Sequence, residues 1–137
     1  MDSNNIEKIE TEVADLIKLN EYTVLIELYG GSDITADIVI ELRVKAISLF
    51  NGGKFFSIID GTKGYATLTN EALAYSAKDE KLAEHRLAQA IVVDTLSLSM
   101  IANFYLKFKK PLRPVKIFDK MHKAHRWLDS KKYLLEE

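Results

Sequence analysis

The chain has no cysteine, only two prolines and no hydrophobic run long enough to cross a bilayer. Without cysteine there is no disulfide, thiolate zinc site, iron–sulfur cluster or cysteine nucleophile, so stability has to come from packing. Every apolar stretch falls short of the roughly 20 residues that a transmembrane helix needs. The first five residues, Met1 to Asn5, have neither the basic start nor the apolar segment of a signal peptide. We therefore expect a cytoplasmic protein.

The length and composition indicate a single domain over residues 1–137. With 47% hydrophobic residues, the chain can bury a core without cross-links. The net charge of −1 hides an asymmetry, because residues 1–84 carry 8 basic and 15 acidic side chains, whereas residues 85–137 carry 11 and 5. Two outcomes stay open: separate acidic and basic sides that steer partners or favour head-to-tail self-association, or interleaved elements that mix the charges.

The first half of the chain predicts a β-hairpin, a helix and a buried strand. Residues 14–28 alternate with period two around Asn20-Glu21, which indicates the hairpin, and we expect residues 6–13 to extend its first strand. Helical spacing runs from Thr35, a suitable N-cap, to Phe50. The apolar run Phe55–Ile59 is typical of a strand covered on both faces, and a loop over Gly61–Leu68 is expected to follow.

The second half alternates helices and strands. Thr69 is a suitable N-cap for a helix through Ala77 that restarts through Glu84. The elements expected after it are a buried strand at Ala88–Val93, an apolar helix at Ser97–Lys107, a strand at Val115–Phe118 and a helix from the cap Asp119 to Ser130. A hairpin followed by repeated helix and strand predicts a mixed sheet with parallel strands and helices packed on it.

The runs Ile101–Pro111 and Pro114–Asp119, followed by Ala124, Trp127 and Leu128, resemble an uncharacterised group of small bacterial STAS-like domains. STAS denotes the fold shared by sulfate transporters and anti-sigma factor antagonists. The resemblance covers nearly the whole chain in element order and is specific over residues 88–128. It implies a compact α/β module that binds another protein and does not catalyse a reaction.

The resemblance also marks one position in the first helix after the central strand. STAS antagonists that are switched by phosphorylation carry Ser or Thr in an Asp-Ser-Ser-Gly-like turn where that helix begins. The nearest counterpart here is Leu68-Thr69-Asn70-Glu71, which has neither the Asp nor the Gly of that turn. Thr69 is therefore a candidate contact residue, and the motif itself does not predict its phosphorylation.

Asp60 and Gly61 follow a buried strand, where α/β folds often bind ligands. They do not begin a phosphate-binding loop, because Gly64 is followed by Tyr65 and not by the required lysine and hydroxyl residue. The alternative is a surface turn, in which glycine supplies positive φ. The Asp60 carboxylate is also suited to accept bonds from nearby amides and order the loop.

Metal and catalytic chemistry have little support in the residue pattern. His122 and His125 lie three residues apart on the expected last helix, but zinc normally needs three or four protein ligands, which favours a solvated helix face. No local Ser-His-Asp arrangement or carboxylate pair is recognisable, so we predict neither a metal, a cofactor nor an enzyme. A predicted pI near 6.3 also argues against nucleic-acid binding.

Apolar residues cover more than one stripe of the expected helix at 97–108, including Met100, Phe104, Tyr105 and Phe108. The second face is covered by the core of the same chain, by a partner or by an apolar ligand. The leading hypothesis is a non-enzymatic regulatory or scaffolding module that acts by protein contact, including self-association as a homodimer. The alternative is a carrier or sensor of a small apolar ligand between this helix and the sheet, as in CRAL-TRIO lipid binders.

Overall fold

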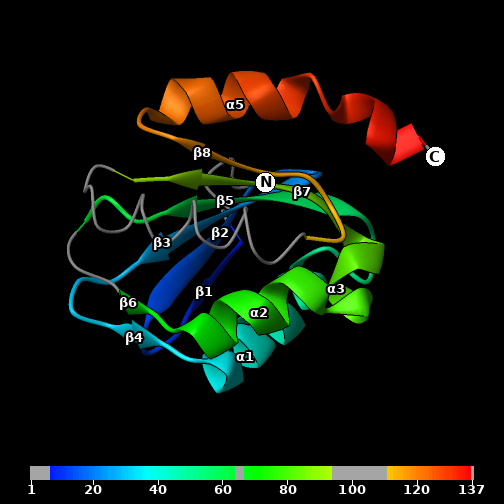
Figure 1. Ribbon diagram of the computed structural model, residues 1–137. Helices are drawn as coiled ribbons and strands as arrows, with labels where there is room; N and C mark the ends of the chain where they lie inside the picture. Colours follow the sequence, from blue (N-terminus) through cyan, green and yellow to red (C-terminus); the bar gives the residue numbers. More distant parts are fainter. Residues whose placement is uncertain (1–6, 64–66, 94–110, 137) are drawn as a thin grey trace.

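A six-stranded mixed sheet forms the centre of the molecule, in the order β1-β2-β3-β5-β7-β8 (Figure 1). The computed structural model describes residues 7–63, 67–93 and 111–136. Strands β1 to β3 pair antiparallel, and from β3 to β8 every pairing is parallel, which confirms the predicted mixed sheet. The strands span Lys8–Glu10 (β1), Ala14–Asn20 (β2), Thr23–Leu28 (β3), Phe55–Asp60 (β5), Arg86–Val92 (β7) and Val115–Phe118 (β8).

The predicted hairpin is confirmed as β2 and β3, closed by a turn in which Asn20 Oδ1 accepts a bond from the Tyr22 amide at 2.9 Å. The expectation that residues 6–13 extend its first strand is wrong. Those residues contain a separate strand, β1, which folds back antiparallel on β2. The turn between them forms because Thr11 Oγ1 accepts bonds from the Val13 and Ala14 amides at 3.1 and 3.0 Å.

Helices cover both faces of the sheet (Figure 1). On one face lie α1 (Ala36–Leu49), α2 (Asn70–Lys78) and α3 (Glu80–His85), and on the other lies α5 (Met121–Asp129), followed by the 3₁₀ helix η1 (Lys132–Glu136). Thr35 caps α1 as predicted, since its side chain accepts from the Ile38 amide. Asn51 and Gly52 have positive φ values of 51° and 80°, a conformation that ends helices.

Side chains alternate between the two faces of the sheet and build a core on each. Towards α1 the strands place a cluster that includes Leu16, Ile26 and Phe55, whereas Phe56 and Ile58 point towards α5. Strand β5 is therefore covered on both faces, as its unbroken apolar run predicted. The α5 side is closed by buried Ala124 and Leu128 and by Trp127, whose ring centroid lies 5.8 Å from that of Phe118. These three residues attach the last helix to the sheet.

Two further details of the sequence-based prediction are wrong. Residues Thr67–Leu68 were expected in a loop but form β6, which pairs parallel with β4 (Asp33–Ile34). A two-residue strand has no periodic signal, and only its partner, distant in sequence, creates it. Asp119 does not cap the last helix, because Lys120 holds the cap position without a side-chain bond and Asp119 pairs with Lys123 at 3.0 Å.

The expected apolar helix at 97–107 lies outside the described residues. Within the described part of the chain, no helix is long and apolar enough to cross a membrane. The chain enters β8 through Leu112, whose amide donates to the Ala77 carbonyl at 3.1 Å, and Arg113, whose Nε donates to the Ala83 carbonyl at 2.8 Å. These bonds attach the start of β8 to α2 and α3.

Candidate functional site: a cavity under three helices and a basic outer helix

Asp60 and Gly61 lie at the carboxyl end of β5, and both form hydrogen bonds with neighbouring residues of the chain. Asp60 is buried, and its Oδ1 accepts bonds from the Thr62 amide at 2.9 Å and the Thr62 hydroxyl at 2.6 Å. The prediction that this carboxylate orders the following loop is confirmed. The Gly61 amide donates to the Val92 carbonyl at 2.9 Å, so it prolongs the pairing of β5 with β7. A binding role for either residue stays a prediction.

Three carboxylates lie side by side across neighbouring strands, because Asp15 pairs with Glu27 and Glu27 with Asp60. Lys63 contacts Glu27 at 2.7 Å, and this hydrogen bond and charge raise the pKa of Lys63. Tyr29 donates its phenol to Asp15, which together with burial raises the pKa of Tyr29 to about 12. The carboxylates are thus committed to partners in the same chain.

His122 and His125 are exposed on the outer side of α5. Among the residues that the structure describes, no group of three His, Asp or Glu side chains is placed to hold a metal ion. Within the described residues, His122 and His125 therefore do not form a metal site.

Thr69 caps α2 and connects it to the two-stranded sheet of β4 and β6. Its hydroxyl oxygen accepts from the Ala72 amide at 3.0 Å and donates to the Ile34 carbonyl at 3.4 Å, and its own amide donates to the same carbonyl at 3.1 Å. The predicted N-cap is confirmed. Its role as a partner contact stays a prediction. The other candidates, Met100, Phe104, Tyr105 and Phe108, lie outside the described residues.

A cavity that the sequence did not predict lies between the sheet and the helices α1, α2 and α3. Its volume is about 80 Å³, well above the 10–15 Å³ or so that one water molecule needs. The wall is mainly aliphatic, from Ile26 and Ile59 on the strands to Leu42 and Ala46 on α1. The cavity thus offers a small, largely apolar space beneath the three helices.

Polar side chains border this cavity from the middle of the sheet. Ser57 on β5 and Gln89 on β7 are directly paired across the strands and are only 1% and 4% exposed. Ser57 Oγ has no hydrogen-bond partner among the described residues. An unsatisfied buried hydroxyl costs about 1–3 kcal/mol, so a native core usually avoids one. At the same border, Arg86 Nη1 donates to Ser76 Oγ at 3.4 Å.

Beside the cavity, hydrogen bonds from Arg43 connect α1 to the neighbouring helices. Arg43 on α1 donates through Nη1 to both carboxylate oxygens of Asp79, at 3.1 and 3.0 Å, and to the Tyr75 hydroxyl at 3.1 Å. Burial alone would lower the pKa of Arg43, but the hydrogen bond and charge of Asp79 outweigh it and raise the pKa. Asp79 also caps α3 through the Leu82 amide, so one carboxylate links α1 to α3.

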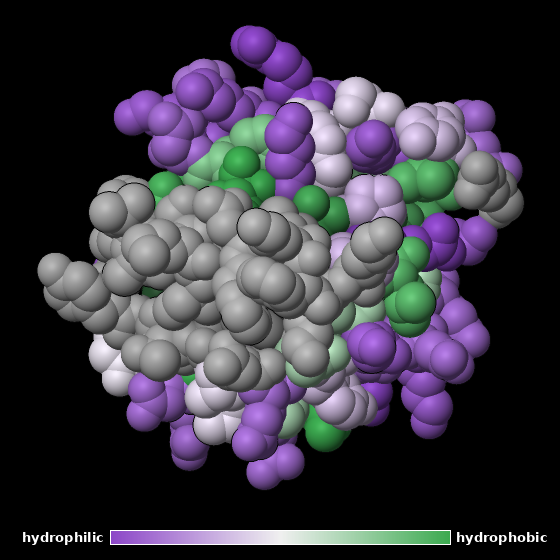
Figure 2. Space-filling view, viewed as in Figure 1, coloured by the Kyte–Doolittle hydropathy of each residue, from purple (hydrophilic) through white to green (hydrophobic). Residues whose placement is uncertain are grey.

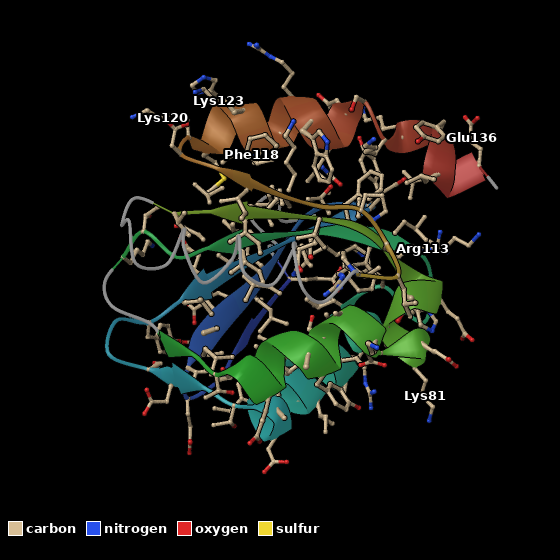
Figure 3. The ribbon with its side chains drawn as sticks, in the orientation of Figure 1. Lys81, Arg113, Phe118, Lys120, Lys123 and Glu136 are labelled. Atoms are coloured by element: carbon tan, nitrogen blue, oxygen red, sulfur yellow. The ribbon has the colours of Figure 1, made fainter. Side chains whose placement is uncertain are left out.

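The outer side of α5 carries a second distinctive feature, a basic surface. Lys120 and Lys123 project from the start of α5, away from the sheet (Figure 3). The α5 margin of the molecule, at the top of Figure 2, is mostly hydrophilic. We call the exposed cations of β8, α5 and the start of η1 the basic face; its members are Lys116, Lys120, Lys123, Arg126 and Lys132.

The strand order separates this basic face from acidic residues. Strand β1 forms one edge of the sheet and β8 the other. Residues 7–21, around the β1 edge, carry five acidic and two basic side chains, whereas residues 111–136 carry three acidic and seven basic ones. The two sheet edges therefore differ in charge. In these two segments the acidic and basic side chains lie on separate sides of the molecule and are not mixed by interleaved elements.

The sheet order and the helices on its two faces define a SpoIIAA-like, or STAS-like, α/β domain. A solved structure of an uncharacterised protein of the DUF3478 family from Shewanella loihica PV-4, which has a SpoIIAA-like fold, aligns with a TM-score of 0.52 and 18% identity. The alignment covers 93% of this chain and 98% of that one. This likeness confirms the fold that the sequence resemblance implied.

The family itself follows from the sequence. The model of the domain of unknown function DUF7793 matches residues 17–132, so the chain belongs to that family. No curated protein matches it.

Proposed function

We propose that the protein is a non-enzymatic regulatory or scaffolding module that works by protein contact through its basic face. The observation that carries this proposal is the separation of charge between the β8 and β1 edges of the sheet. Exposed charges of one sign steer a partner of the opposite sign and set its orientation. The STAS-like fold is compatible with such a role but does not by itself establish it.

The partner that fits is an acidic protein surface, and a second copy of this chain supplies one. A dimer with a two-fold axis would place the basic face of each copy against the acidic β1 edge of the other, so the same contact would form twice. Attraction between exposed charges weakens as salt is added, because the Debye length falls from about 10 Å at 0.1 M to about 3 Å at 1 M ionic strength. Self-association by this route is therefore expected to depend on salt.

Sedimentation equilibrium over a range of protein concentrations tests the proposal. We expect the average mass to rise with concentration at low salt and to fall towards the monomer at high salt. The double variant Lys120→Glu, Lys123→Glu should remain monomeric. A matched control is Lys81→Glu, which reverses an exposed lysine on α3, on the other side of the sheet (Figure 3). This control should associate like the parent protein.

A partner other than a second copy is tested with the same variants. Immobilised protein should retain an acidic partner from the source cell, the Lys81→Glu variant should retain it equally, and the Lys120→Glu, Lys123→Glu variant should lose it. A chain that is monomeric at every concentration, and whose captured proteins do not differ between these variants, would contradict the proposed contact surface.

A further inference from the structure

We propose that the cavity beneath α1, α2 and α3 binds a small molecule with a short apolar chain and a carbonyl head group, which Ser57 and Gln89 recognise. This inference is independent of the basic face. It rests on the position of the two polar residues, which are neighbours on the central strands and border the cavity. It also rests on the Ser57 hydroxyl, which has no hydrogen-bond partner among the described residues.

The head group follows from the chemistry of the two side chains. The Gln89 carboxamide offers two N–H donors and one acceptor, and the Ser57 hydroxyl donates one bond and accepts others. A carbonyl oxygen between them would receive one bond from each and would thereby satisfy the Ser57 hydroxyl, which the fold leaves without a partner among the described residues. An alcohol oxygen also has two lone pairs, but its O–H adds a donor that a carbonyl lacks, so one of the two side chains would have to accept a bond as well.

The chain of the ligand follows from the wall. Aliphatic side chains enclose most of the space, and Ile26, Ile59 and Ile91 form its sheet side. At about 80 Å³, the cavity is far smaller than the 300–1,000 Å³ or so of sites for drug-sized ligands. A body of a few carbon atoms is therefore the size class that fits, and long-chain lipids are excluded from this space.

The residues around the cavity bear on the charge of the head group. Two arginines border the cavity, Arg43 and Arg86, and no described residue of its lining is acidic. The Asp79 carboxylate lies against Arg43. A carboxylate and a neutral amide share the carbonyl that Ser57 and Gln89 would bind, so the two are compared directly.

Methyl-resolved NMR titration of the full chain with butyrate, butyramide and 1-butanol tests the proposal. We expect saturable shifts of the Ile26, Ile59 and Ile91 methyl groups, with a dissociation constant on the order of 1 mM for the better carbonyl compound and weaker binding of 1-butanol. Ile58 is the internal control, because it lies on the same strand but in the core towards α5. Its methyl shifts should not change.

Variants separate recognition by the polar pair from simple filling of an apolar space. Ser57→Ala and Gln89→Leu should each weaken binding of the carbonyl compound by roughly 3- to 10-fold, the loss expected for one hydrogen bond. Ser48→Ala removes an exposed hydroxyl on α1 and should leave binding unchanged. The fold of each variant is checked from the methyl spectrum before ligand is added.

Three results would overturn the inference. The first is the absence of saturable shifts with all three compounds. The second is binding that Ser57→Ala and Gln89→Leu leave unchanged while both variants remain folded. The third is a set of shifts centred on Ile58, which would place the site on the other face of the sheet.

Discussion

Replacing Arg43 with methionine should destabilise the fold strongly, because it leaves the Asp79 carboxylate buried without its cation. The side chain of Asp79 is 3% exposed and that of Arg43 is 16% exposed, and the pair is joined at 3.0 Å. Breaking a buried pair by removing one partner typically costs about 3–5 kcal/mol, against a total stability of about 5–15 kcal/mol for a domain. We therefore expect Arg43→Met to lower the free energy of unfolding by about 3 kcal/mol.

A double-mutant cycle isolates the pair from the other roles of each residue. Asp79→Asn removes the charge but keeps an N-cap for α3, since asparagine caps as well as aspartate does. The double variant should lose less stability than the sum of the two single losses, because it leaves no uncompensated charge. Urea denaturation followed by circular dichroism and by Trp127 fluorescence measures all four proteins. Coincident transitions for the two probes would support two-state analysis.

The exposed pair of Lys123 with Asp119 provides the matched control for this cycle. Its side chains are 51% and 66% exposed, so Lys123→Met should change stability by less than about 1 kcal/mol. A loss below about 1 kcal/mol for Arg43→Met, or single losses that simply add in the double variant, would refute the reasoning. The contribution of Arg43 to the free energy of unfolding would then be as small as that of an exposed residue, despite its contacts.

Three further predictions concern single side chains. Ser57→Ala should leave the free energy of unfolding unchanged or raise it by up to about 1 kcal/mol in urea denaturation, because it removes a buried hydroxyl without a described partner; a clear loss would show that the hydroxyl is satisfied. Tyr29 should ionise near pH 12 in ultraviolet absorbance, and Asp15→Asn should move that step towards 10.0. Because the pKa of Tyr29 is raised in the folded state, its stabilising contribution is complete below pH 10 and is lost as the pH rises towards 12. Thr69→Ala should cost about 1 kcal/mol and Thr69→Ser much less, since serine keeps the cap of α2; equal thermal stability of the two variants would argue against the cap.

Most of the fold could be predicted because its signals are local. The alternation of residues 14–28 indicated a hairpin, and the caps Thr35 and Thr69 marked the starts of two helices. The unbroken run at Phe55–Ile59 indicated a strand buried on both faces, which requires helices on both sides of the sheet. These patterns depend on a few neighbouring residues, so they can be recognised without knowing the tertiary structure.

The errors have two causes: one is pairing over a distance, and the other is local contacts that a residue pattern does not distinguish from the expected ones. The pairing of β6 with β4 exists only because the chain returns to the same place, and β1 became a separate strand through a turn organised by Thr11. Asp119 pairs with Lys123, four residues further on, and does not occupy the cap position. Neither a period nor a propensity scale reports which of two available partners a side chain contacts.

The candidate sites also combine features that the sequence determined with features that only the tertiary structure decided. By itself the sequence determined the fold class, the lack of thiol chemistry and the charge difference between the two halves of the chain, because composition and periodicity are properties of the chain alone. Only the tertiary structure decided where those charges lie, since the strand order separates the β1 and β8 edges. It also brought Ser57 and Gln89 together beside one cavity. Their proximity depends on the register of two parallel strands that are distant in sequence, which no local pattern encodes.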